Sequence, residues 1–260
     1  MNTAQPLSGR HALVTGGSRG IGYAVAQRLA GLGARITLMG RDADALDLAV
    51  GRLAGQAGFV RGDIAKRSQV VQAFAQAKEA FGVIDILVNN AGQAESQRFD
   101  RIDEDAWQRM IQVNLSGTFH CMQAALPDML ENQWGRIVNV ASTAGLIGYP
   151  YVSAYCAAKH GVIGLTRALA LETARKGVTV NAVCPGYTET DIVQGAIENI
   201  VQKTGVSADQ AKATLAGRNP QGRLVQPDEV AQAVAWLCQP ASASINGQAI
   251  PVDGGEVMAG

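Results

Sequence analysis

A glycine-rich run, Thr15-Gly-Gly-Ser-Arg-Gly-Ile-Gly22, restricts the possible folds of this chain more than any other segment. It joins a short apolar segment, residues 11–14, to residues 21–32, whose apolar positions follow helical spacing. Glycines in such a run let the backbone turn tightly and approach a pyrophosphate, which then rests on the helix N-terminus. The spacing departs by one residue from the common G-x-G-x-x-G form, and glycines also occur in plain turns. Between a strand and a helix, however, the run favours a dinucleotide site formed by Gly16, Ser18, Arg19, Gly20, Ile21 and Gly22.

Strand-like and helix-like segments alternate along the rest of the chain. The expected strands are residues 11–14, 34–39, 58–63, 85–89, 135–141, 178–184 and 248–252, and the expected helices after the first are 43–53, 68–81, 105–130, 151–175 and 227–238. This alternation implies parallel strands joined by right-handed crossovers, with helices on both faces of the sheet. We therefore predict an α/β fold, a Rossmann-like doubly wound three-layer sandwich with about seven parallel strands.

One segment interrupts the alternation. Residues 186–224 are polar and only weakly helical, and they follow the carboxyl end of an expected strand. In doubly wound sheets, ligands bind at those strand ends, and an insertion there covers the ligand. We expect residues 1–260 to form a single catalytic domain in which residues 186–224 cover the substrate.

Charge, apolar segments and cysteines exclude several classes of protein. Lysine plus arginine (22) equals aspartate plus glutamate (22), which disfavours a general nucleic-acid binder. The sequence has no apolar run long enough for a membrane span and no signal-like segment at its start, so a cytoplasmic protein is expected. Its four cysteines form no Cys-x-x-Cys pair, and its three histidines lack ligand spacing. The cysteines are predicted to be buried, and no metal site is expected.

The end of the second expected strand bears on the choice of cofactor. Sites for NAD commonly place a carboxylate there, where it accepts hydrogen bonds from ribose hydroxyls. This chain has Gly40 followed by Arg41, and Arg41, together with Arg19, suits the 2′-phosphate of NADP(H). NADP(H) is therefore favoured, while NAD(H) stays an alternative because an arginine stacks on adenine in either case. A further alternative is that Arg41 is a solvated neighbour of Asp42.

Tyr155 and Lys159, four residues apart in an expected helix, lie on the same helix face. A phenol with a pKa near ~10 is a poor acid or base at neutral pH, and a neighbouring ammonium is expected to lower that pKa. Ser142 follows the fifth expected strand, where its hydroxyl would hold a substrate carbonyl near the tyrosine. Tyr-x-x-x-Lys alone is common on exposed helices. The apolar surroundings, residues 152–171, predict instead a buried Lys159 with a functional role.

Seven elements in order resemble the classical short-chain dehydrogenases/reductases over nearly the whole chain. They are Thr15–Gly22, Asp63, Asn89-Asn-Ala-Gly92, Asn114, Ser142, Tyr155-x-x-x-Lys159 and Pro185-Gly186. The resemblance implies a catalytic tetrad of Asn114, Ser142, Tyr155 and Lys159, in which Asn114 holds a water that relays protons to Lys159. It also implies cofactor contacts from Asp63, Ile64, Asn90, Tyr155, Lys159, Pro185, Gly186, Thr188 and Thr190. From the residues alone, Asn89–Gly92 is equally a turn that stabilises the sheet.

Within the family, three segments look most like bacterial 3-oxoacyl thioester reductases, acting on carrier-protein or CoA thioesters, and polyketide ketoreductases. These are residues 139–145, 155–161 and 180–186, which the family's alcohol dehydrogenases largely share. We expect an NAD(P)-dependent oxidoreductase that interconverts a carbonyl and a secondary alcohol. Substrate contacts are expected from Ser142, Tyr149, Tyr155 and Tyr187, in a pocket that also includes Gln93, Thr143 and Tyr151.

Several alternatives remain open. The enzyme could be an NAD-linked 3-hydroxyacyl or secondary-alcohol dehydrogenase, or a non-catalytic dinucleotide-sensing protein, although the intact tetrad disfavours the latter. A sugar-nucleotide epimerase of the extended branch is disfavoured by the chain length and the glycine spacing. Arg167, Arg175 and Lys176 would suit an acidic carrier protein or simply a solvated helix end.

The expected helix 151–175 is apolar on more than one face, which predicts contact with another subunit. The expected helix 105–130 is a natural neighbour for it. The resemblance points the same way, because the family commonly pairs these two helices across a two-fold axis. We therefore expect a homotetramer, with coverage of both faces within one chain as the alternative.

Overall fold

A seven-stranded parallel sheet forms the centre of the computed structural model, which describes residues 5–258. The strand order is β3-β2-β1-β4-β5-β6-β7. The strands are β1 (His11–Thr15), β2 (Arg35–Gly40), β3 (Ala57–Arg61), β4 (Ile86–Asn89), β5 (Gly135–Val140), β6 (Val178–Pro185) and β7 (Ala249–Val252). In the register, Ala12 of β1 lies between Ile36 of β2 and Ile86 of β4. The chain therefore starts at the middle of the sheet, runs to one edge, and returns to build the other half.

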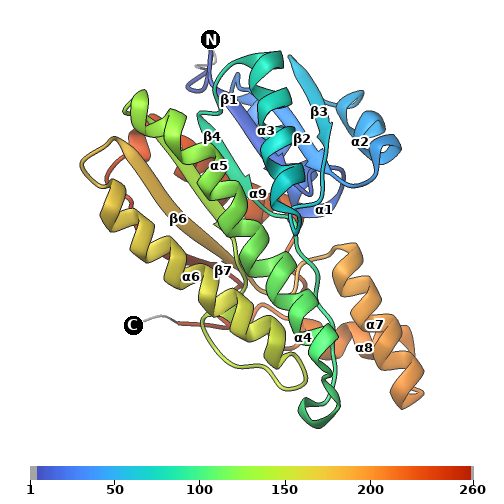
Figure 1. Ribbon diagram of the computed structural model, residues 1–260. Coiled ribbons are helices and arrows are strands. Elements are labelled where there is room, and N and C mark those ends of the chain that lie inside the picture. Colours follow the sequence, from blue (N-terminus) through green and yellow to red (C-terminus); the bar gives the residue numbers. More distant parts are fainter. Residues whose placement is uncertain (1–4, 259–260) are drawn as a thin grey trace.

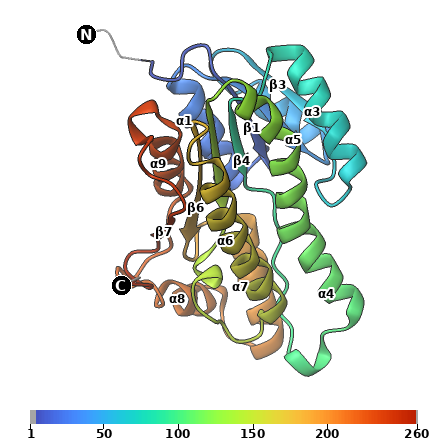
Figure 2. The ribbon, with the colours of Figure 1, turned by 60° about the vertical axis from the view of Figure 1, so that its left-hand side comes forward.

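Helices cover both faces of the sheet. On one face lie α1 (Gly20–Gly31), α2 (Ala43–Val50) and α9 (Pro227–Cys238), and on the other lie α3 (Arg67–Phe81), α5 (Gly117–Glu131) and α6 (Ser153–Thr173). The second group is in front of the sheet in Figure 1, and the turned view in Figure 2 shows α9 and α5 on opposite sides of it. The predicted α/β three-layer fold is thereby confirmed.

The central strands are buried from end to end, as strands covered on both faces must be. Every residue of β1, β5 and β6 is buried. Side chains alternate between two large apolar clusters, so that Val14 packs with α1 and α9 while Leu13 packs with α3 and α5. The four cysteines are all buried and unbonded, as predicted. Among residues 5–258, no helix has the length and apolar character needed to cross a membrane.

Two helices lie beyond the carboxyl ends of the strands, at the lower right of Figure 1. They are α7 (Asp191–Thr204) and α8 (Ala208–Ala216), and both fall inside the segment 186–224 that was expected to be only weakly helical. The sequence interpretation therefore underestimated the helical content of this segment. Ser207 and Gln210 form a reciprocal capping box that starts α8, and Val193, Ile197 and Leu215 build a small separate core.

Two other helices differ from the prediction in ways that matter for the site. The expected helix 105–130 consists of α4 (Glu104–Ile111), a π-helical turn (Gln112–Ser116) and α5. The expected helix 151–175 begins only at Ser153, because Tyr151 has a left-handed φ of 68°. Expected helix 43–53 ends at Val50, and expected strand 58–63 ends at Arg61. The expected helix 227–238 is confirmed at both ends.

Candidate active site

The loop between β1 and α1 has a shape that only glycine fits at its crucial positions. Gly16 and Gly20 have φ values of 63° and 54°, in the left-handed region. At Gly22, a Cβ atom would lie 2.3 Å from the carbonyl oxygen of Gly16. The first turn of α1 therefore packs directly on the loop, which brings backbone amides to its surface.

A hydrogen-bonded clamp from β4 fixes this loop. The Thr15 hydroxyl accepts hydrogen bonds from the amides of Asn90 and Ala91, each at 3.0 Å. The Asn90 side-chain amide donates to the carbonyl oxygens of Thr15 and Gly16. Asn90 thus holds the glycine loop against β4, and the ribose contact implied by the resemblance stays a prediction.

The start of α1 suits an anionic group. Arg19 occupies the N-cap position without a side-chain cap, and the first turn carries no acidic residue. By contrast, Asp42 caps α2 by accepting a hydrogen bond from the amide of Ala45. The amides at the start of α1 have no side-chain partner, which is what a dinucleotide pyrophosphate requires. The residues present therefore fit a dinucleotide.

The segment after β6 lies over the glycine loop. A Cβ atom on Gly20 would come within 3.3 Å of the Thr190 methyl group. Arg19 Nη1 is 2.8 Å from Asp191 Oδ2, and both side chains are exposed. Thr188 is buried and donates to the carbonyl oxygen of Gly186 at 3.0 Å. Thr190 thus lies beside the glycine loop, while the cofactor contacts expected of Thr188 and Thr190 stay predictions.

At the adenosine side, Gly40 ends β2 and Arg41 is exposed. Asp42 serves as the α2 cap, and Arg41 forms no ion pair among residues 5–258. Arg41 is therefore a solvated neighbour of Asp42 in the protein alone, and its contact with a cofactor stays a prediction. Asp63 accepts a hydrogen bond from the amide of Ala65. Ile64 is buried and packs against the Gly117 backbone of α5. An adenine contact from Ile64 stays a prediction.

Ser142, Tyr155 and Lys159 converge where β5 ends and α6 begins. Ser142 follows Ala141 and accepts a hydrogen bond from the amide of Ala144 at 3.1 Å, in a short 3-10 turn. Lys159 is buried, as predicted, and its Nζ donates to the Val140 carbonyl oxygen at 2.9 Å. The same Nζ lies 5.6 Å from the centre of the Tyr155 ring.

The pKa values in this cluster differ from the expectation for the phenol. Burial raises the pKa of Tyr155 to about 12, and its hydrogen bond with Ser142 offsets only part of that rise. Burial also lowers the pKa of Lys159 to about 8. The expected lowering of the phenol pKa by the ammonium is therefore wrong for the protein alone, because loss of hydration disfavours both charged forms.

Asn114 occupies the π-helical turn between α4 and α5 and is completely buried. Its Nδ2 donates to the carbonyl oxygens of Gln93 and Met110, and its Oδ1 accepts from the amide of Gln93. A Cβ atom on Gly92 would lie 2.8 Å from Asn114 Oδ1 and 3.8 Å from Lys159 Nζ. Asn114 and Lys159 therefore approach each other across Gly92, while the water relay between them stays a prediction.

A layer of tyrosines lies next to the serine. Tyr149, Tyr155 and Tyr187 belong to one apolar cluster, and the rings of Tyr149 and Tyr187 meet edge to face at 6.3 Å. The Tyr149 hydroxyl is 2.8 Å from Thr143 Oγ1 and donates to Glu256 Oε1 at 2.7 Å. Arg218 stacks its guanidinium over the Tyr149 ring at 5.0 Å. The sequence interpretation missed Glu256 and Arg218, because nothing in the local pattern links either residue to Tyr149.

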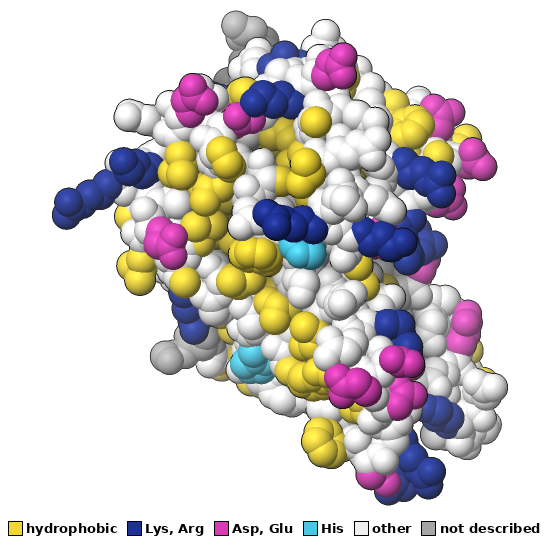
Figure 3. Space-filling view, viewed as in Figure 1, with side chains coloured by type: hydrophobic (Ala, Val, Ile, Leu, Met, Phe, Trp, Pro, Cys, Tyr) yellow, Lys and Arg dark blue, Asp and Glu magenta, His cyan; other side chains and the backbone are white. Residues whose placement is uncertain are grey.

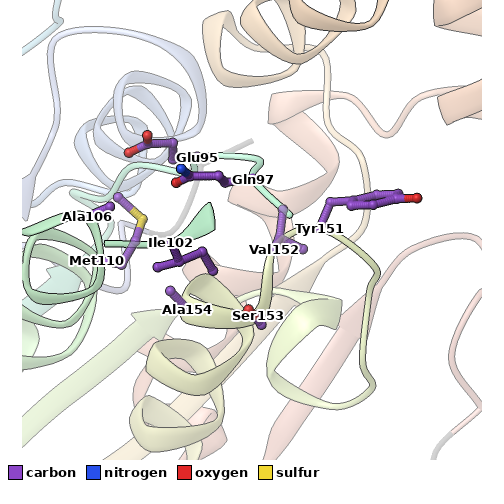
Figure 4. Close-up of a pocket in the computed structure, with 9 residues that line it drawn as sticks. All are labelled: Glu95, Gln97, Ile102, Ala106, Met110, Tyr151, Val152, Ser153 and Ala154. Carbon is purple, nitrogen blue, oxygen red and sulfur yellow. The ribbon is translucent and has the colours of Figure 1, made fainter. Parts of the chain in front are cut away.

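Tyr151, expected in the same pocket, lies elsewhere. The residue is 62% exposed, and its ring points away from the neighbouring small cavity in Figure 4. Its carbonyl oxygen accepts a hydrogen bond from the amide of Gln97, which ties the loop after β4 to the start of α6. The left-handed backbone at Tyr151 leaves its side chain outside the cluster of Tyr149, Tyr155 and Tyr187, so its place in the substrate pocket stays a prediction. The cavity of about 10 Å³ beside it has room for one water at most.

Comparisons with known proteins agree with this geometry. The sequence pattern of the short chain dehydrogenase family matches residues 10–200. A D-beta-hydroxybutyrate dehydrogenase from Cupriavidus necator is 41% identical over 256 residues, covering 96% of this chain and 99% of that protein. A 3-oxoacyl-acyl-carrier-protein reductase from Vibrio cholerae is 37% identical over 252 residues, covering 97% and 99%.

A solved structure supports the same relationship. An actinorhodin polyketide ketoreductase variant crystallised with NADPH matches with a TM-score of 0.93 and 38% identity, covering 98% of this chain and 99% of its own. These three proteins all act on alcohol or carbonyl groups by name. The chain therefore belongs to the short-chain dehydrogenases, oxidoreductases that interconvert CH–OH and C=O groups.

Proposed function

We propose that this enzyme reduces the ketone of a 3-oxoacyl thioester or a related ketone, with Tyr155 as the proton donor. The observation that carries the proposal is the convergence of Ser142, Tyr155 and Lys159 at the strand ends, beside a glycine loop that fits a dinucleotide. Carboxyl ends of parallel strands are where such sheets bind their ligands.

Each member of the cluster has a distinct role in this proposal. The Ser142 and Tyr155 hydroxyls donate hydrogen bonds to the substrate oxygen and stabilise the negative charge that develops on it. Tyr155 then gives its proton to that oxygen, or takes it back in the reverse direction. A nicotinamide, when bound, supplies or accepts the hydride at the carbon.

Lys159 and Asn114 act behind the tyrosine. Lys159, fixed by the Val140 carbonyl oxygen, lies beside the phenol, and in this proposal its ammonium stabilises the phenolate that remains after proton transfer. It also holds the nicotinamide ribose in this proposal. Asn114, with its amide fixed by Gln93 and Met110, keeps the loop at Gly92 close to Lys159 and accounts for the π-helical turn at this position.

We infer NADP(H) as the preferred cofactor. A carboxylate is missing from the end of β2, where Gly40 stands, and the Arg41 side chain is exposed beside it. Arg41→Ala is expected to weaken binding of NADPH by roughly 1.5–3 kcal/mol, the range for a hydrogen bond to a charged group, and NADH far less. Fluorescence titration with both cofactors measures this difference. Equal losses would indicate adenine stacking instead.

The direction and substrate need a turnover screen. Resemblance to a D-beta-hydroxybutyrate dehydrogenase supports the reverse reaction on a short 3-hydroxy acid as the second candidate. We would assay 3-oxoacyl thioesters, short 3-oxo acids, cyclic ketones and secondary alcohols with NADPH, NADH and their oxidised forms. The proposal predicts the highest kcat/KM for a 3-oxoacyl thioester with NADPH. A preference for an alcohol with NAD would contradict it.

We further propose a single catalytic domain in which residues 186–224 cover the substrate, and a homotetramer built through α5 and α6. Figure 3 shows hydrophobic side chains in a band over these two helices, where a groove of about 360 Å³ lies. The groove is lined by Leu115, Ser116, Phe119, Gly161, Gly164 and Leu165.

Gly164 supports a partner at this groove. A Cβ atom there would meet nothing within 4 Å, although glycine inside a helix costs about 1 kcal/mol relative to alanine. The close approach of a second copy explains the glycine. Gly164→Trp is expected to reduce the sedimentation coefficient without changing the circular dichroism spectrum, whereas Gly31→Trp, at an exposed helical glycine on α1, leaves the assembly intact. A wild-type protein that sediments as a monomer would refute the tetramer.

A further inference from the structure

Arg218 is placed at the outer side of the tyrosine layer that contains Tyr155. Its guanidinium carbon lies 5.0 Å from the centre of the Tyr149 ring, and Tyr149 packs with Tyr155 and Tyr187 in one cluster. A positive charge from Arg218 also reaches Tyr187, where it partly offsets the rise in pKa that burial causes. Nothing in the proposed mechanism uses this arginine.

The backbone beneath Arg218 is fixed, although the side chain is exposed. Asn219 is buried, and its Oδ1 accepts a hydrogen bond from the amide of Gln221. The segment after β7 packs so closely on it that a Cβ atom on Gly254 would lie 1.9 Å from Asn219 Oδ1. A side chain on such a support has less freedom to lose when it binds a ligand.

The charge of Arg218 has no carboxylate partner among residues 5–258. The ion pairs there include a two-bond pair between Arg223 and Glu229, only five residues further along, but none with Arg218. Glu256 is the acidic residue of the tyrosine layer, and it accepts the hydrogen bond of the Tyr149 hydroxyl instead. Arg218 thus keeps its planar fork of donors available beside the tyrosine layer, and that fork matches a carboxylate or a phosphate.

We propose that Arg218 recognises an anionic group, a carboxylate or a phosphate, on the part of the substrate that extends from the reacting carbonyl toward solvent. This inference rests on the proposed function, because it assumes that the carbonyl lies at Ser142 and Tyr155. The anion is either the carboxylate of a short 3-oxo acid or a phosphate of a pantetheine thioester. The negative charge of Glu256 disfavours an anion at the same place, so Arg218 and Glu256 together set the charge preference at the outer side of the tyrosine layer.

Two matched pairs of substrates test the inference with saturating NADPH. One pair is acetoacetate and its methyl ester, and the other is 3-oxobutyryl-CoA and the 3-oxobutyryl thioester of N-acetylcysteamine. Arg218→Gln is expected to raise KM for one charged member at least about tenfold, and KM for its neutral partner less than twofold. Arg218→Lys restores part of the loss, and Glu256→Gln lowers KM for the same charged substrate. A response of the acetoacetate pair identifies the carboxylate as the recognised anion, and a response of the CoA pair identifies a phosphate.

Arg52→Gln is the matched control, because it removes the same charge from an exposed position after α2. Binding of butyrate and of CoA to the NADPH-loaded variants, measured by calorimetry, tests the same anion recognition without turnover. Weaker binding by Arg218→Gln than by Arg52→Gln supports the inference. Equal binding by these two variants, or equal changes in KM for charged and neutral substrates, overturns it. If the wild type reduces none of the four ketones, the proposed function fails, and calorimetry still decides the role of Arg218.

Discussion

The wall of the site that carries Ser142, Tyr155 and Lys159 is fixed by buried hydrogen bonds, whereas the proposed covering segment, residues 186–224, carries exposed ion pairs. In the wall, Asn139 of β5 bonds to Asn89 of β4 and to Thr166 of α6, all with buried groups. In the covering segment, Lys212 and Glu189 pair at 2.6 Å with half of each side chain exposed. Exposed pairs of this kind contribute about 0–1 kcal/mol and are screened by salt.

The difference corresponds to two physical requirements. Proton transfer needs atoms held within a few tenths of an ångström, and buried, fully bonded side chains provide that precision. Entry of a substrate needs a segment that opens at little cost, and the exposed ion pairs and small separate core of residues 186–224 suit the covering role proposed for them. The proposed site thus combines a rigid wall with a covering segment that we expect to open more easily than the wall.

The largest expected effect is a loss of turnover caused by a change in the wall. Tyr155→Phe removes the proton donor and very little volume, so the fold and cofactor affinity should be retained while kcat falls by at least ~10². Steady-state kinetics together with a cofactor titration measure both quantities. Retention of a tenth of the wild-type activity would remove Tyr155 from its assigned role.

Gly22→Ala tests how tightly the glycine loop, the other closely packed part of the site, is held. The new Cβ atom would lie 2.3 Å from the Gly16 carbonyl oxygen and 2.5 Å from Asn90 Nδ2, so the loop or helix must shift. We expect a loss of about 1–3 kcal/mol in unfolding free energy, typical of overpacking, along with weaker cofactor binding. Urea unfolding measures the first effect. Gly31→Ala is the control, since a Cβ atom there meets nothing within 4 Å, and similar losses in both variants would contradict the prediction.

The stability of the folded protein depends on pH through Lys159. Its pKa is about 8 in the folded protein and 10.5 ordinarily, so between these values the unfolded chain binds more protons. The unfolding free energy should therefore rise with pH over that window, by at most roughly 1 kcal/mol per pH unit from this group. Lys159→Met removes this contribution, and the difference between the two proteins cancels other titrating groups. A difference that is constant from pH 8 to 10.5 would show that Lys159 is not perturbed.

The smallest expected effect is on the stability of the proposed covering segment, residues 186–224. Glu189→Gln breaks the pair with Lys212, and the free energy of global unfolding should change by less than about 1 kcal/mol. Amides of α7 and α8 should nevertheless exchange faster with solvent, while those of α6 keep their rate. Hydrogen exchange followed by mass spectrometry separates the two regions. Equal acceleration in α6 would show that wall and cover open together, against the comparison above.

Much of this architecture follows from local sequence patterns. Alternating apolar segments gave the strands and the order of helices, and Pro227 marked the start of α9. The burial of Lys159 followed from its apolar neighbours. Ser207-x-x-Gln210 was a readable capping signal for α8 that the expectation of weak helicity overlooked.

Other features depend on contacts between distant residues. Tyr149 and Glu256 are 107 positions apart, and Arg218 reaches Tyr149 from the covering segment. The outward turn of Tyr151 comes from a left-handed backbone that few tyrosines adopt. The high pKa of Tyr155 arises from dehydration by the assembled cluster. Spacing along the chain carries no information on any of these.

The strand order has a consequence for how such enzymes diversify. The glycine loop and the end of β2 come from the first three strands, whereas Ser142, Tyr155 and Arg218 come from the part of the chain after β4. If Arg41 and Arg218 have the roles proposed above, recombination between related genes within the α3 region would exchange cofactor choice and substrate choice independently. The seam of every such chimera runs along β1 and β4, so Thr15 and Asn90, which bond across it, must be inherited from compatible parents.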